Sequence, residues 1–261
     1  MNRITCLVED KPSHTLMGEH GLSLYIEGER DILFDTGQSS LFAENASILG
    51  LELGGADAAI ISHGHYDHGG GLRHFMGIND SAEVFMGEGA FRRRYAVEDS
   101  VKRFIGIPEV KSERINFVGE TLPLGDGYTI LKDFGGRFGR PAGNRTLFME
   151  AGSGLVPDSF QDEIVLVIES GREVHIITGC SHSGILNIVE AASQLFPDRS
   201  IGVLAGGFHL SGDVSGVARG LAEFKVREIY TGHCTSEEAL HELDDILGNV
   251  RPLRPGTVIE L

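Results

Sequence analysis

Residues 62–71 read "SHGHYDHGGG" and place three histidines and one aspartate within six consecutive positions. His63 and His65 are two residues apart, so their side chains face the same way if the chain there is extended. Asp67 and His68 then follow after a turn. Imidazole and carboxylate groups are ligands of zinc and related metals, and this spacing suits two metal ions side by side. The stretch therefore predicts a site for two divalent transition-metal ions, zinc first, with manganese or iron as alternatives.

Ligand-type residues also stand at the ends of other apolar segments. The segments "DILFD", "VHIIT", "VLAGG" and "EIYTG" end at or just before Asp35, Cys180, His182, His209 and His233. Such short runs are β-type, and in the closing third they alternate with helical patterns at 185–195, 217–224 and 237–247, which favours an α/β sheet covered by helices. Ligands bind at the carboxyl ends of the strands in such sheets, so we expect these side chains to converge on the metal ions.

The chain is predicted to form a single domain over residues 1–261. Its first part contains β-type runs at 4–9, 22–27, 31–35, 58–62 and 83–86, with helical patterns at 41–49 and 72–76. Between residues 87 and 162 the pattern weakens and glycine is frequent, which favours long loops or a lid over the strand ends. Within this region, the basic run "FRRRY" at 91–95 is predicted to be a solvated helix face, with a phosphate clamp as the alternative.

Composition limits the class of protein. With 261 residues and 41% apolar content the chain can bury a sizeable core, and its net charge of −16 disfavours nucleic acid as a partner. The three cysteines are an odd number at unrelated spacings, which favours a reducing compartment over a disulfide framework. We find no signal-peptide pattern and no run of membrane-span length. We therefore expect a cytoplasmic protein without a membrane partner.

The motifs carry a resemblance. "SHGHYDHGGGL" resembles the HxHxDH signature of the metallo-β-lactamase superfamily, "ILFDTGQS" resembles its first motif, and "TGCSH" and "YTGHCT" sit where later ligand motifs are expected. With "EHGLSLYIE" and "GCSHSGILNIV", these stretches further resemble a subgroup that includes the enzyme forming dihydropterin-methyl-ribofuranosylaminobenzene phosphate. The resemblance implies an α/β fold, a four-layer αββα sandwich with a dinuclear metal site at one edge. It assigns His63 and His65 to the first metal, Asp67, His68 and His233 to the second, and Asp35 to orienting a ligand histidine.

The sequence departs from that family at two ligand positions. The family's "HTPGH"-like motif has no counterpart, because no histidine lies between His74 and His175. Cys180 stands near the place of the family's bridging aspartate. We therefore expect His182 to be the third ligand of the first metal. Cys180 is either a bridging or near-site group or a small buried thiol.

The remaining candidates concern the substrate. His20 belongs to the subgroup's pattern, and Arg137 and Arg140 carry guanidinium groups that suit a phosphate or carboxylate, so all three are expected to bind the substrate. His209 follows two glycines and is expected to contact the substrate or donate a proton, with a packed histidine as the alternative. Asp67 is assigned to the reaction as well as to the metal.

These features favour hydrolysis of a small anionic ester or phosphoester. The metals would lower the pKa of a bound water from about 15.7 toward about 7 and so supply hydroxide at neutral pH. The first alternative is a transferase that joins a pterin to a ribofuranosylaminobenzene phosphate-like substrate. The second is a non-enzymatic metal-binding or sensor protein, which would keep the same ligands. The oligomeric state stays open.

Overall fold

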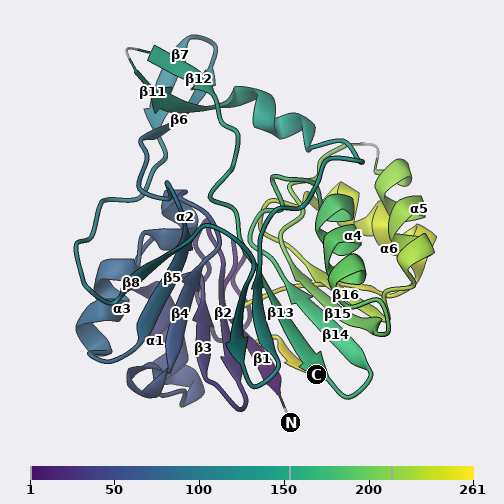
Figure 1. Ribbon diagram of the computed structural model, residues 1–261, viewed down its shortest axis with the longest axis horizontal. Coiled ribbons are helices and arrows are strands. Elements are labelled where there is room, and N and C mark those ends of the chain that lie inside the picture. The colour runs from purple at the N-terminus through teal and green to yellow at the C-terminus, as the bar shows by residue number, and fades with distance from the viewer. Residues whose placement is uncertain (1, 153, 213) are drawn as a thin grey trace.

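The computed structural model of the protein describes residues 2–152, 154–212 and 214–261, whose strands form three sheets (Figure 1). The first sheet has the order β18 (Val258–Glu260), β1 (Arg3–Val8), β2 (Ser23–Glu27), β3 (Ile32–Phe34), β4 (Ala58–Ile61), β5 (Glu83–Gly87) and β8 (Ile115–Val118). The second has the order β17 (Val250–Pro252), β16 (Glu228–Thr231), β15 (Ser200–Gly206), β14 (Glu173–Ile177), β13 (Val165–Ser170), β10 (Tyr128–Leu131) and β9 (Leu122–Gly125). The third, which we call the small sheet, has the order β12 (Gly154–Pro157), β11 (Leu147–Ala151), β6 (Arg94–Glu98) and β7 (Val101–Phe104).

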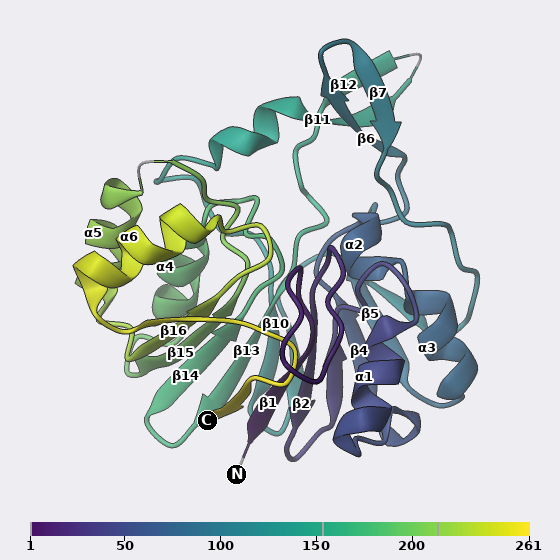
Figure 2. The ribbon, with the colours of Figure 1, turned by 180° about the vertical axis from the view of Figure 1, so that it is seen from behind.

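Helices cover the outer face of each large sheet (Figures 1 and 2). On the first sheet lie α1 (Leu41–Leu49) and α3 (Leu72–Ile78), with the short α2 (Tyr66–Gly69) beside them; on the second lie α4 (Ile185–Leu195), α5 (Ser215–Phe224) and α6 (Glu237–Leu247). Two short 3₁₀ turns, η1 (Leu53–Gly55) and η2 (Ala142–Thr146), complete the helical segments that the structure describes.

Buried apolar side chains form three clusters: one under α1 and α3, one between the two large sheets, and one under α4, α5 and α6. β4 shows how the sequence specifies these layers. Ala58 and Ile60 lie in the cluster between the sheets, whereas Ala59 and Ile61 lie in the cluster under the helices. Successive side chains of a strand point to opposite faces, so a strand that is buried on both faces is apolar throughout. The predicted four-layer αββα sandwich is confirmed.

The parallel strands of the two sheets bring their carboxyl ends to one edge of the sandwich. β3, β4 and β5 are parallel in the first sheet, and β14, β15 and β16 are parallel in the second. Residues that follow these strands line one cavity together with residues of the small sheet. The small sheet therefore lies over the strand ends, on the side of the sandwich where α2 begins (Figure 1).

The helical patterns predicted most of the helix boundaries. The helices α1, α4 and α6 have the predicted bounds, and α5 begins at Ser215, two residues before its predicted start. Ser236 caps α6 by accepting a hydrogen bond from the Ala239 N–H, and Gly50 and Gly248 end α1 and α6 in the left-handed conformation. None of the described helices is long and apolar enough to cross a membrane.

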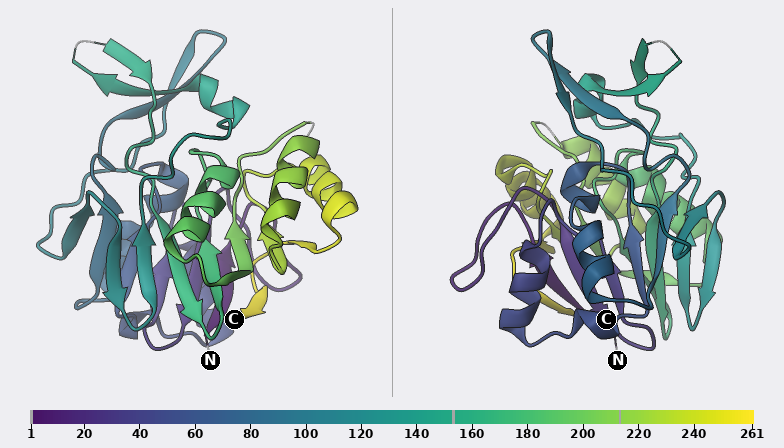
Figure 3. Two further views of the ribbon diagram at one scale, coloured as in Figure 1. Left: turned by 45° about the vertical axis from the view of Figure 1, so that its right-hand side comes forward. Right: turned by 90° about the vertical axis from the view of Figure 1, so that its left-hand side faces the viewer.

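The prediction of loops or a lid over residues 87–162 is wrong for part of that region. β8 is a strand of the first sheet, and β9 and β10 are strands of the second. β10 is buried along its whole length between its neighbours, but these strands are only four residues long and lack a periodic pattern that sequence reasoning could detect. The rest of the region forms η2 and the small sheet, which stands away from the sandwich in both views of Figure 3.

The prediction for "FRRRY" is wrong in part: Arg92 and Arg93 are exposed, but the run forms no helix and Arg94 is buried. Arg94 begins β6 rather than lying on a helix, and its side chain is 2% exposed. It is neither solvated nor free to clamp a phosphate, because buried carboxylates already surround it.

Candidate metal centre

The ligand-type residues predicted from the strand ends come together at the edge of the sandwich. Most of them belong to groups of three side chains whose potential ligand atoms all lie within 4.8 Å of one another. Asp67 lies within hydrogen-bond distance of a member of such a group. These ligand-type residues are His63, His65, Asp67, His68, Cys180, His182, His209 and His233. All of them except His209 are at most 9% exposed.

The first group consists of His63, His65 and His182. The Nε2 atom of His63 lies 3.1 Å from the Nδ1 atom of His65, and the ring of His182 has its centroid 4.9 Å and 5.0 Å from the rings of these two histidines. His65 has extended backbone angles and directly precedes α2, but the chain bends at His63 and Gly64, so it is not extended through "HGH". This group matches the three ligands expected for a first metal ion.

The second group consists of Asp67, His68 and His233. The Nε2 atoms of His68 and His233 are 3.1 Å apart, and the Oδ2 atom of Asp67 lies 3.8 Å and 3.3 Å from them. Asp67 and His68 belong to α2, which turns their side chains back toward the histidines that precede it. This group matches the ligands expected for a second metal ion.

Asp35 and Ser62 fix the ring orientation of two histidines. The Asp35 carboxylate accepts hydrogen bonds from the Ser62 N–H and hydroxyl at 2.7 Å each, and it lies 2.6 Å from the Nδ1 atom of His68. Since the Ser62 hydroxyl gives its one proton to Asp35, it accepts from the Nδ1 atom of His63, 2.9 Å away. The protons of both histidines are thus held on Nδ1, and the lone pairs on Nε2 face the site.

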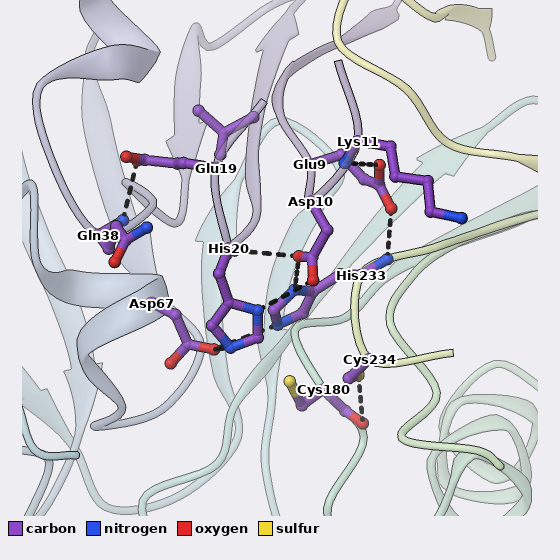
Figure 4. Close-up of polar contacts among 12 residues, drawn as sticks. Glu9, Asp10, Lys11, Glu19, His20, Gln38, Asp67, Cys180, His233 and Cys234 are labelled. Carbon is purple, nitrogen blue, oxygen red and sulfur yellow. Dashed lines mark hydrogen bonds and ion pairs between the residues drawn. The ribbon is translucent and has the colours of Figure 1, made fainter. Parts of the chain in front are cut away.

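Asn144 and Asp10 perform the same task for the other two strand-end histidines. The Asn144 side chain donates to the carbonyl of His182 and accepts from its Nδ1 atom, both at 2.8 Å, which fixes the amide orientation. Asp10 lies 2.6 Å from the Nδ1 atom of His233 (Figure 4). Sequence reasoning missed both residues. Asp10 follows the strand β1, and its place after a strand was the one available signal.

The electrostatics of the first group suit a cation. Burial first, and then the neighbouring histidines, lower the pKa of His63 and His182 well below the usual value, and burial lowers that of His65 to about 3. These rings are therefore neutral and keep a lone pair for a ligand. The Nε2 atoms of His65 and His182 are buried and have no hydrogen-bond partner among the described residues. An unpartnered buried nitrogen costs free energy, and a metal ion in this group would satisfy that of His182. His65 turns its Nδ1 atom toward the Nε2 atom of His63, so Nδ1 is its ligand atom for such an ion.

The second group attracts a positive charge as well. The Nε2 atoms of His68 and His233 face each other at 3.1 Å, and the Nδ1 atom of each ring is already held by a carboxylate. Two such nitrogens need a proton or a cation between them. Burial lowers the pKa of His233, but its bonds to Asp10 and Asp67 outweigh this and raise the pKa well above the usual value. The donor set of imidazole, carboxylate and thiol groups fits zinc and other borderline transition metals.

Cys180 lies between the two groups. Its Sγ atom is 3.1 Å from the Nε2 atom of His68, and it belongs to groups of potential ligands with His63, with His182 and with His233. Burial, followed by the neighbouring Cys234, raises the pKa of the Cys180 thiol well above its usual value. All three cysteines of the chain are free, as predicted. A thiol at this position must lose its proton before it can bind a metal.

His20 and His209 line the cavity beside these groups. The Nδ1 atom of His20 lies 2.9 Å from Asp10 and its Nε2 atom 3.3 Å from Asp67, so His20 bridges the two carboxylates at the mouth of the site (Figure 4). The ring of His209 has its centroid 4.5 Å from that of His182, and its backbone N–H donates to the Cys234 thiol. Both residues therefore line the cavity beside the candidate ligands, and their contact with a substrate stays a prediction.

The two predicted arginines lie elsewhere. Arg137 is 72% exposed and pairs with Glu190 at 2.6 Å, and Arg140 donates to the Ser159 carbonyl and lines a neighbouring cavity. The cavity beside the histidines has a volume of about 280 Å³, and the one arginine among its described lining residues is Arg103, from β7. The glycine-rich sequence around Arg137 indicated a lid but carried no information on where each side chain points.

A buried ion cluster connects the small sheet to the "HGH" segment. Arg94 of β6 pairs with Asp158 at 2.9 Å and with Asp162 at 2.6 Å, and Asp162 also accepts a hydrogen bond of 2.7 Å from the Gly64 N–H. A side chain at position 64 would collide with the carbonyl of Ala90 and the guanidinium of Arg94. Gly64 therefore allows the backbone between the two histidines to approach the ion cluster closely.

Comparison with known sequences gives the family. The sequence model of the metallo-beta-lactamase superfamily matches residues 17–194. The chain is 32% identical to the uncharacterized protein MJ0448 of Methanocaldococcus jannaschii, covering 93% of this chain and 94% of that protein. It is 28% identical to the 7,8-dihydropterin-6-methyl-4-(beta-D-ribofuranosyl)-aminobenzene-5'-phosphate synthase of the same organism, covering 91% of this chain and 88% of the synthase.

Comparison with solved structures agrees. Tm1679, a metal-dependent hydrolase of the beta-lactamase superfamily, superposes with a TM-score of 0.87 at 31% identity, covering 100% of this chain and 99% of its own. Igni18, a metallo hydrolase of Ignicoccus hospitalis, superposes with a TM-score of 0.55 at 15% identity over the full length of both chains, a likeness of fold alone. Its motifs, its sheets and these relatives all show that the chain belongs to the metallo-β-lactamase superfamily.

Proposed function

We propose that this protein is a metal-dependent hydrolase of a small anionic ester or phosphoester. One observation carries the proposal: two groups of imidazole and carboxylate ligand atoms, with a buried unpartnered nitrogen of His182 among them, converge beside a cavity of about 280 Å³. A cavity of that size suits a small molecule rather than a polymer.

The residues divide between two ions in this proposal. The first ion would be held by His63, His65 and His182, the second by Asp67, His68 and His233, with Cys180 between them. Divalent metal ions in these places would lower the pKa of a coordinated water and stabilise negative charge on the attacked centre. The Asp35 carboxylate, the Ser62 hydroxyl, the Asn144 amide and the Asp10 carboxylate keep the ligand histidines in the required tautomer.

Arg103 takes the role expected of Arg137 and Arg140 at the metal ions. Arg103 lines the cavity and forms no ion pair with any other residue that the structure describes, so its guanidinium is available to an anionic group of the substrate. Hydrogen bonds to Asp10 and Asp67 raise the pKa of His20 to about 9, so His20 adds a positive charge at the cavity mouth at neutral pH. We assign His209 to proton donation, because its ring lines the cavity with its centroid 4.5 Å from that of His182 and, although burial lowers its pKa, the neighbouring Cys234 raises it above the usual value.

The second candidate is a transferase that joins a pterin to a ribofuranosylaminobenzene phosphate-like substrate. The relative that carries the synthase name is 28% identical over 91% of this chain, which favours this candidate. Both candidates use the same metal ligands and an anionic substrate, and they differ in whether water or a second substrate receives the transferred group. We further propose a cytoplasmic location, since three free thiols suit a reducing compartment.

The test begins with elemental analysis of protein purified without added metal. Up to two equivalents of transition metal are expected, and a panel of phosphoesters, lactones and thioesters then identifies the bond that is cleaved. Arg103→Ala is expected to raise KM for an anionic substrate with unchanged metal content, whereas the matched variant Arg137→Ala should change neither. No metal uptake from zinc, manganese or iron would contradict the proposal. Metal uptake without turnover of any panel member would favour the transferase or the sensor.

A further inference from the structure

A second cavity adjoins the metal site and is not used by the proposed chemistry. It has a volume of about 360 Å³ and lies between the glycine-rich segment before η2, the start of α4 and the start of α5. Its walls are mainly apolar, with side chains that include Phe138, Pro141, Leu186, Phe208, Leu210 and Val217. A concave, apolar space of this size is typical of a small-molecule site.

The two cavities meet at His209, which lines both. Gly143 lines the metal cavity and its neighbour Ala142 lines the second one. The Gly143 backbone lies so close to His209 that an added Cβ would come within 2.6 Å of the Nε2 atom of the ring. One imidazole ring and one glycine thus form the partition, so the two cavities are separated by the thickness of a single side chain.

We propose that the second cavity binds a planar, apolar group of the same substrate whose anionic end lies in the metal cavity. This inference rests on the proposed function and narrows its substrate class to two-part molecules, with an aromatic group on one side of the bond that reacts and an anionic group on the other. Phe138 and Phe208 contribute rings for packing against an aromatic group. Their neighbours on the walls are mainly aliphatic, which favours an uncharged group in the interior.

Arg140 has a place in this arrangement. It lines the second cavity, is exposed, and uses one guanidinium nitrogen to donate to the Ser159 carbonyl at 3.1 Å. A guanidinium has five N–H donors, so others remain for a carbonyl or ring nitrogen at the edge of an aromatic group. The predicted substrate contact at Arg140 would thus belong to the aromatic end of the molecule rather than to the end at the metals.

The test compares two phosphonates that the enzyme cannot hydrolyse. Binding of methylphosphonate and of 2-naphthylmethylphosphonate to the metal-loaded protein is measured by titration calorimetry. We expect the naphthyl compound to bind at least about tenfold more tightly, because it buries apolar surface in the second cavity. Val217→Phe should fill the cavity and bring the ratio of the two dissociation constants close to one. The matched variant Val258→Phe, on the outer strand β18, should keep the wild-type ratio.

Equal binding of both phosphonates by the wild-type protein would overturn the inference, as would a ratio that Val217→Phe leaves unchanged. Should Val217→Phe fail to fold by circular dichroism, Ala142→Phe fills the cavity from an exposed position and gives the same test. The binding readout is independent of turnover. A preserved tenfold preference without any hydrolysis would refute the hydrolase and keep the two-part site, whereas hydrolysis without a preference would refute the two-part site alone.

Discussion

Replacing Arg94 by methionine should destabilise the fold more than any comparable change of an arginine on the surface. The Arg94 guanidinium is 2% exposed, pairs with Asp158 and Asp162, and donates to the backbone carbonyls of residues 89, 90 and 92. Methionine retains much of the stem but removes the charge and every donor, so two buried carboxylates would face each other without a cation. Breaking a buried pair in this way costs about 3–5 kcal/mol of the free energy of unfolding.

Arg137→Met is the matched control. Arg137 also pairs with a carboxylate at 2.6 Å, but it is 72% exposed, and a surface pair contributes at most about 1 kcal/mol. Urea unfolding followed by circular dichroism measures the free energy of unfolding of both variants, and thermal unfolding measures their Tm. At about 2–4 °C per kcal/mol for a domain of this size, Tm should fall by roughly 6–20 °C for Arg94→Met and by a few degrees at most for Arg137→Met. Similar losses below about 1 kcal/mol for both variants would refute the reasoning.

The loss should also depend on pH. Burial raises the pKa of Asp162 above its usual value although Arg94 opposes this, and removal of Arg94 raises the pKa further. A carboxyl group whose pKa is raised in the folded state favours folding at low pH, and this advantage is lost as the pH rises through the folded pKa. Arg94→Met should therefore be less destabilising at pH 5 than at pH 8. An equal loss at both pH values would show that Asp162 keeps its charge without Arg94.

Three further predictions concern the ligands and their surroundings. Asp35→Asn should weaken metal binding by about 10- to 100-fold in competition with a chelator, because it removes the acceptor that orients His68; unchanged affinity would show that this orientation is dispensable. His182→Ala should lose one equivalent of metal by elemental analysis. Cys180→Ser should weaken the binding of both ions, and it should reduce the pH dependence of that binding because no thiol proton needs to be displaced. A His182→Ala protein with two tightly held metals would show that the third ligand is another residue. In metal-free protein, the pKa of His20 is about 9 when folded and near 6.5 when unfolded, so stability falls as the pH rises through that interval, and His20→Gln should flatten the fall in urea unfolding.

Much of the fold could be predicted because its elements are locally periodic. Strands such as β4 are short apolar runs bounded by turn residues, and α1, α4 and α6 show helical spacing along their whole length. The strand ends could be predicted as the site because parallel strands share an edge. The same reasoning failed for β8, β9 and β10, whose pairing depends on partners distant in the sequence rather than on a local pattern.

The supporting residues of the site could not be predicted for the same reason. Asp10 contacts His233 across 223 positions of sequence, and Asn144 contacts His182 across 38. Neither stands in a motif with a fixed spacing, and acidic and amide residues are frequent in any loop. Glu163, which accepts hydrogen bonds from the backbone N–H groups of His182 and Ser183, is a further example. Residues that bind a metal have characteristic types and spacings, whereas residues that hold those ligands in place are recognisable only in three dimensions.

The contact between Gly64 and Arg94 has a consequence for how this site can evolve. Position 64 has no room for a side chain while the guanidinium of Arg94 and the carbonyl of Ala90 lie against it. Among relatives, any residue larger than glycine between the first two histidines should therefore occur together with a smaller residue at position 94, with the loss of at least one of Asp158 and Asp162, and with a different backbone path around position 90. The two positions should change as a pair. The identity of a residue between two metal ligands would then be decided by a strand of the small sheet, 30 residues further along the chain.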